Sequence, residues 1–110
     1  MSDVETPLNL PVPATAVAGA ATLNKMSGVI TSEAITTAAG ATYTLTLTNS
    51  AIDASSLVMV NVNNGTNTTG VPVVSTVAAT LHQAVIVILN AATITAFSGG
   101  TLKIGFTVTN

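Results

Sequence analysis

Threonine alternates with large apolar residues over much of the chain that follows Asn24. The clearest case is 41–49, where Tyr43, Leu45 and Leu47 fall on one side of an extended chain and threonines fall on the other. Successive side chains of a strand point to opposite faces, so a period of two is typical of a strand with one buried face. No stretch shows a convincing helical period, and the pattern predicts an all-β chain.

Six to eight short strands follow from the same alternation and from the turn residues between its runs. Pro72 lacks a backbone donor, so it places its run at a sheet edge or marks its start. The run 81–89 is apolar on both faces from Val85, which favours a central position. Short strands with turn signals about every 8–12 residues predict a small antiparallel β-sandwich, jelly-roll- or immunoglobulin-like. The expected strands are 25–32, 41–49, 57–63, 71–77, 81–89, a short one at 93–97, and 102–108, with Val58, Val60, Val62, Leu102, Ile104, Phe106 and Val108 facing the core.

The chain has 110 residues, the size of one domain. We expect an extended N-terminal arm over residues 1–22 and the sandwich over 23–110.

Charge is scarce: the formal net charge is −2, and the only charged residues are Asp3, Glu5, Lys25, Glu33, Asp53 and Lys103. A free monomer with so few charges is poorly protected against association. Two explanations fit: much of the surface is buried against other chains, or hydroxyls and amides keep it soluble.

The arm is set apart by its prolines and by an alternation of its own. Proline favours extended conformations, and the alanines that follow lack helical periodicity. An arm with alternating apolar residues would suit a neighbouring surface, whereas the simpler interpretation is a loose tail. The candidate capsid- or subunit-contacting residues are Leu8, Leu10, Pro11, Val12 and Pro13.

Residues suited to catalysis are nearly absent, so we expect no enzyme, no catalytic residue, no cofactor and no metal site. His82 is the only histidine, and a lone histidine at a strand start is far more often a polar edge residue than a catalyst. Nothing in the spacing of His82, Glu33 and Asp53 implies a metal site. No G-x-S-x-G motif or lysine-bearing phosphate loop is present.

Several partners and compartments are also disfavoured. Two lysines, no arginine and three aromatics argue against nucleic acid, which needs cations for phosphate contacts and rings for stacking. No apolar run approaches the roughly 20 residues of a membrane-spanning helix. There is no cysteine, and the acidic N-terminus is unlike a secretory signal. We therefore expect the protein to stay in the cell that makes it or to leave by lysis.

The loop 63–70 is the remaining candidate for binding. Its asparagines and glycines tolerate turn conformations, so a plain turn explains it. An exposed binding tip also fits, since binding residues tend to lie on loops over a rigid scaffold. The candidate binding residues are Asn63, Asn64, Thr66, Asn67 and Thr68.

Segments 27–33 (SGVITSE) and 36–49 (TTAAGATYTLTLTN) resemble small β-rich structural proteins of tailed bacteriophages. The loop 63–70 and the strand 102–106 (LKIGF) fit the same style. The closest resemblance is to capsid decoration, or cement, proteins, and it covers about residues 25–110. No motif within it assigns functional residues.

The resemblance implies a virion protein made in the host cytoplasm that binds the outer surface of an assembled head. Proteins of this kind often form homotrimers that clamp adjacent subunits of the major capsid protein, and their N-terminal arms reach across to capsomers or sister subunits. The alternative is a tail or fibre β-domain that binds a host glycan or receptor through the loop 63–70.

Overall fold

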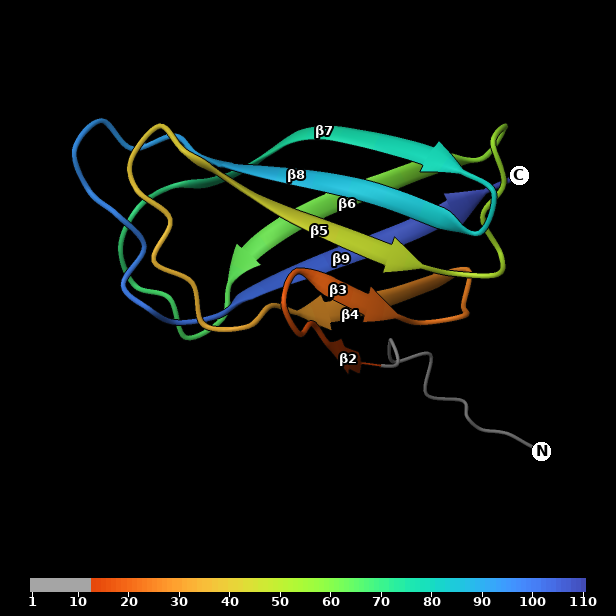
Figure 1. The fold of residues 1–110 in the computed structure, drawn as a ribbon, viewed down its shortest axis with the longest axis horizontal. Helices are drawn as coiled ribbons and strands as arrows, with labels where there is room; N and C mark the ends of the chain where they lie inside the picture. The colour runs from red at the N-terminus through yellow and green to blue at the C-terminus, as the bar shows by residue number, and fades with distance from the viewer. Residues whose placement is uncertain (1–12) are drawn as a thin grey trace.

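A computed structural model describes residues 13–110. In this range the chain forms eight strands and no helix, arranged as two sheets packed face to face (Figure 1). One sheet has the order β2-β4-β9-β6 and the other β3-β5-β8-β7. The predicted all-β sandwich is confirmed. Its strands are β2 (Pro13–Thr15), β3 (Ala20–Thr22), β4 (Ser27–Thr31), β5 (Thr42–Thr48), β6 (Leu57–Asn64), β7 (Pro72–Thr80), β8 (Gln83–Asn90) and β9 (Leu102–Thr109).

Nearly every connection crosses from one sheet to the other. Among the described strands, only β7 and β8 follow one another within a sheet, joined by a tight turn at Leu81 and His82. Hydrogen-bonded neighbours are therefore distant in sequence, as when β4 pairs with β9. To form such pairs, the chain must lose the entropy of closing long loops before it gains the contacts between the strands. Folding is therefore expected to be slow.

The sheets are mixed, so the expected antiparallel sandwich is wrong in one respect. The edge strand β2 pairs with β4 in parallel, and the edge strand β3 pairs with β5 in parallel. The reason is the path of the chain, which runs along one sheet in β2, back along the other in β3 and forward again in β4. All other pairs are antiparallel.

Residues 13–22, which the sequence assigned to the arm, belong to the sandwich. β2 and β3 add one short strand to each sheet, and Ala16 between them and Ala21 of β3 enter the core, at 1% and 8% exposed. These two edge strands, one in each sheet, lie close to each other on the same side of the sandwich (Figure 1). Residues 1–12 of the expected arm lie outside the described residues.

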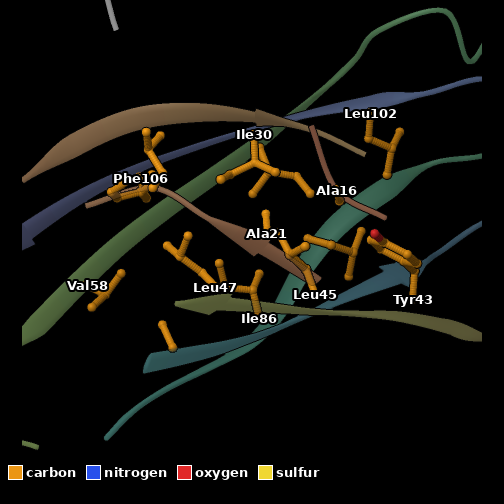
Figure 2. Close-up of a cluster of buried hydrophobic side chains, with 14 of the residues drawn as sticks. Ala16, Ala21, Ile30, Tyr43, Leu45, Leu47, Val58, Ile86, Leu102 and Phe106 are labelled. Atoms are coloured by element: carbon orange, nitrogen blue, oxygen red, sulfur yellow. The ribbon is translucent and has the colours of Figure 1, made fainter. Parts of the chain in front are cut away.

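The alternating apolar residues fill the space between the sheets, as predicted. Figure 2 shows Leu45, Leu47 and Ile86 of one sheet facing Ile30 and Phe106 of the other. Full burial of side chains of this size contributes about 1.5–3 kcal/mol each. Val60 and Val62 face the same core but are only half-buried, because β6 is an edge strand. β8 is central in its sheet, and β7 begins at Pro72 on an edge, both as expected.

The short strand expected at 93–97 does not exist. Both edges of β8 and of β9, the strands before and after it in the chain, are already paired, so this segment cannot pair with either of them. It forms part of the long connection between them, and Phe97 anchors that connection in the core. Asn90 bends the chain there by accepting a hydrogen bond from the Ala92 N–H and donating one to the Thr95 carbonyl.

Buried asparagines hold the connections at both ends of the sandwich. The fully buried Asn90 side chain also donates to the Thr37 carbonyl and accepts from the Val71 N–H, so one amide joins three connections. Asn49 has the same role at the other end of the sandwich, where its side-chain amide donates a hydrogen bond to the Lys25 carbonyl at 2.6 Å. A neutral amide supplies donors and an acceptor without the desolvation cost of a buried charge.

We expect Asn90→Ala to lower the free energy of unfolding by about 3 kcal/mol, because it leaves several buried backbone groups without partners. Denaturant unfolding would measure this loss. Asn63→Ala, at an exposed position of β6, is the matched control and should change stability by less than about 0.5 kcal/mol. Equal effects of the two substitutions would contradict the structural role of Asn90.

Candidate interaction surfaces

The ionisable side chains of the described residues are scattered. His82 lies exposed in the β7–β8 turn, where its backbone takes a positive φ of 62°. Its N–H donates to the Ile52 carbonyl and its carbonyl accepts from the Asn49 N–H, so the residue fastens one turn to another. Residues 13–110 contain no cluster of three His, Asp or Glu side chains able to hold a metal ion, and His82, Glu33 and Asp53 do not come together.

Asp53 closes an exposed turn. Its carboxylate accepts hydrogen bonds from the Ser55 hydroxyl and N–H, both at 2.8 Å, and from the Ser56 hydroxyl. The Ser55 side chain foremost, and then the Ser55 backbone and Ser56, hold the pKa of Asp53 below its ordinary value. These contacts are those of a local turn, in which the carboxylate caps neighbouring backbone donors.

The predicted binding loop has one buried member. Asn67 is 2% exposed, donates to the Asn64 side chain and the Thr69 carbonyl, and accepts from the Ser98 N–H. Its amide therefore holds the loop in shape and does not face solvent. The exposed members are Asn63, Asn64, Thr66 and Thr68. That this loop binds a ligand stays a prediction.

The arm residues Leu8, Leu10, Pro11 and Val12 lie outside the described residues. Pro13 is the first described residue, and it stands opposite Val29 in the β2–β4 register. The arm therefore joins the sandwich at the edge of the β2-β4-β9-β6 sheet. This fixes where the arm begins.

An open hollow of about 510 Å³ lies on that same sheet. Gly105 sits mid-strand in β9, between Val29 of β4 and Asn61 of β6, and so removes a side chain from the middle of the outer face. Met59 and Val60 of β6 also line the hollow. A glycine in a strand interior often marks a place where another chain or ligand approaches closely.

Exposed apolar side chains border this hollow. Leu57 and Met59 of β6 point away from the core and are 62% and 61% exposed. Lys103 is the only charged residue whose position on the described strands puts it on this outer face. We call this surface, made of Val29, Leu57, Met59 and the Gly105 hollow, the apolar face.

Sequence reasoning missed the apolar face, although two signals for it were present. Leu57 and Met59 alternate with Val58 and Val60, so the strand 57–63 is apolar on both sides in its first half. Gly105 interrupts an otherwise regular strand. What sequence could not supply is the register that places these residues beside Val29.

The outer face of the other sheet differs in character. It presents threonines of β5, of which Thr42, Thr44 and Thr48 are exposed, beside half-buried valines of β8. No charged residue lies on the described strands of this face. Besides hydroxyls it carries the half-buried side-chain amide of Gln83, and Val73 of β7 is 41% exposed there.

Comparisons with models of protein families, with curated proteins and with solved structures find no match for this chain. No helix in residues 13–110 is long and apolar enough to cross a membrane. The candidate surfaces therefore rest on the geometry and chemistry of the chain itself.

We expect Gly105→Ala to fill part of the hollow without loss of stability. A Cβ there would meet only the end of the exposed Asn61 side chain, at 2.7 Å from Oδ1, and that side chain can move. Alanine also allows the unfolded chain fewer backbone conformations than glycine does, so less entropy is lost on folding. The free energy of unfolding should therefore stay the same or rise by up to about 1 kcal/mol. Denaturant unfolding measures it.

Gly100→Ala is the matched control, because a Cβ at that position would meet backbone atoms of Thr66 and Asn67 at 2.5 Å. It should destabilise the protein by more than about 2 kcal/mol. A comparable loss for Gly105→Ala would show that Asn61 is fixed and that the hollow is part of the packing.

Proposed function

We propose that this protein is a structural virion protein that decorates the outer surface of an assembled phage capsid. It binds the major capsid protein and clamps adjacent capsid subunits, as a homotrimer whose N-terminal arms reach across to neighbours. The resemblance of residues 25–110 to capsid decoration proteins suggests this role, and the scarcity of charge is consistent with it. Permanent interfaces are depleted in charged residues at their centres.

The observation that carries the proposal is the position of the apolar face relative to the arm. Pro13 stands opposite Val29, and Val29 lines the hollow, so the arm begins at the border of the apolar face. A chain anchored there can bring its own apolar residues, Leu8, Leu10 and Val12, to the same partner that the apolar face contacts. Proline favours extended conformations, so from the sequence we expect Pro11 and Pro13 to favour an extended chain there.

Binding of this kind stabilises a lattice by mass action. A ligand that binds only the assembled lattice shifts the equilibrium away from disassembled subunits. Apolar surface contributes about 25 cal/mol per Å² removed from water, so a face and an arm together supply more than either alone. Three linked copies multiply the effect through avidity.

A glycan-binding role is less well supported. Sugar-binding sites commonly stack rings on exposed aromatic side chains, and Tyr43, Phe97 and Phe106 are all buried here. In the loop 63–70, the side-chain NH₂ of Asn67 donates its hydrogen bonds within the loop and holds the loop in shape. We therefore favour the capsid over a receptor as the partner.

The proposal is tested by the composition and stability of purified phage heads. We expect the protein in heads in a fixed ratio to the major capsid protein, and trimers of the free protein by light scattering. Heads assembled without it should lose DNA at a lower temperature, and adding the protein should restore them. Heads that contain none of it, or that are equally stable without it, would contradict the proposal.

Residue-level support comes from cosedimentation of variants with heads that lack the protein. Met59→Asp should weaken attachment at least tenfold, because it places a charge on the apolar face, and the pair Leu8→Asp with Leu10→Asp should do the same through the arm. Thr76→Asp puts the same charge on the exposed surface of the other sheet and is the matched control. Equal weakening by Thr76→Asp would remove the apolar face from the interface.

A further inference from the structure

The corner between β2 and β3 is a tight turn held in a demanding conformation. Val17 and Ala20 exchange two backbone hydrogen bonds across Ala18 and Gly19, whose φ angles are 52° and 76°. Positive φ at both central residues is the geometry of a type I′ turn. Gly19 cannot be replaced easily, because a Cβ there would meet the Thr44 carbonyl oxygen at 2.9 Å.

The Glu33 carboxylate fastens this corner to the sandwich. One oxygen accepts a hydrogen bond from the Gly19 N–H at 2.7 Å, and the other accepts from the Tyr43 hydroxyl at 2.5 Å. Glu33 follows β4 in one sheet, and Tyr43 lies on β5 in the other. A single side chain therefore joins the corner to both sheets.

The other contacts of residues 13–22 are few and small. β2 and β3 each pair over three residues, and the side chains that this segment buries are the alanines 16 and 21. Alanines bury little apolar area, so hydrophobic contact holds the segment weakly compared with the central strands. A charge-assisted hydrogen bond is among the strongest contacts available to it.

We propose that Glu33 is a positioning residue for the N-terminal arm, a carboxylate latch that holds residues 13–22 across the side of the sandwich. While the latch is closed, residues 1–12 leave from one fixed point at the border of the apolar face. When it opens, residues 13–22 detach from the sheet edges and the arm loses its fixed origin. The consequence for attachment rests on the proposed function, whereas the latch itself does not.

The latch is closed at neutral pH. Burial alone would raise the pKa of Glu33, but the hydrogen bonds from Tyr43 and from the Glu33 and Gly19 backbone outweigh burial and lower it below the ordinary 4.5. Tyr43 is the only titratable group that faces the carboxylate among the described residues. Burial, and then the bond to Glu33 and its charge, raise the pKa of Tyr43 far above its ordinary value, so the phenol stays a donor.

The sign of the pH dependence follows from the lowered pKa. The ionised carboxylate stabilises the closed corner at every pH above its ordinary value. That contribution disappears as the pH falls below about 4.5 and through the lower pKa of the folded protein. Acid should therefore open the latch before it unfolds the central strands, which carry no titratable group apart from Tyr43 and Lys103.

Amide hydrogen exchange of the full chain tests the latch without any capsid. We expect Glu33→Gln to speed exchange at Gly19, Ala20 and Ala21 at least tenfold at neutral pH, while β5 and β8 keep their protection. Glutamine presents one acceptor and cannot serve both donors as an anion does. Asp53→Asn removes the same charge at a distant turn and should leave the corner unchanged. Exchange at the corner that is unchanged in Glu33→Gln, or faster throughout the molecule, would overturn the latch.

A pH titration of the unmodified protein tests the latch even if the Glu33→Gln variant fails to fold. The amide proton shift of Gly19 should follow a titration below pH 4.5, and Tyr43→Phe should move that midpoint upward by removing a bond to the charged form. A Gly19 shift that is flat across this range would also overturn the latch.

Attachment to capsids is measured separately. The Glu33→Gln protein and the unmodified protein are each added to capsids that were assembled without this protein. Weaker attachment of this variant, with the unmodified protein binding normally, would support a latch that positions the arm. A loosened corner with unchanged attachment would overturn its role in positioning, and failure of the unmodified protein to bind would count against the proposed function alone.

Discussion

The apolar layer between the two sheets holds together strands that are rarely neighbours in the sequence. Because nearly every connection crosses between the sheets, neither sheet can form as a local unit. β9, near the C-terminus, is paired by β4 and β6 on its two sides. Loss of the layer would therefore release both sheets together, and the surfaces that the sheets carry depend on it as well.

Neutral side chains make most of the side-chain hydrogen bonds around this layer. Three buried asparagines and Ser32 satisfy backbone groups where the connections cross, and Ser32 both donates to the Glu33 carbonyl and accepts from the Leu102 N–H. Glu33 is the exception, since its charge is placed where a short edge segment needs a strong acceptor. A chain with few charges can thus keep its loops ordered, because amides and hydroxyls carry no large desolvation cost.

The two outer faces divide the surface by chemistry. One presents threonines of β5 beside valines of β7 and β8, and the other combines exposed Leu57 and Met59 with a hollow over Gly105. The N-terminal segment enters beside the second face, where β2 pairs with β4. β2 borders the apolar face, and Glu33 contacts the corner that follows β2, so this arrangement links the proposed attachment with the proposed latch.

The alternation of residues by itself determined the fold class, most strands and the core-facing residues, because a period of two leaves only one apolar side to bury. An apolar pattern on both faces indicated the central place of β8, and Pro72 indicated that β7 lies at an edge or begins at that residue. Only the tertiary structure decided the parallel pairs, the inclusion of residues 13–22, the burial of Asn67 and the loss of a strand at 93–97. The apolar face and the contact of Glu33 with Gly19 depend on register and on sheet crossing. These are long-range choices that local sequence does not encode, since a strand's pattern shows which side it buries but not which strand lies beside it.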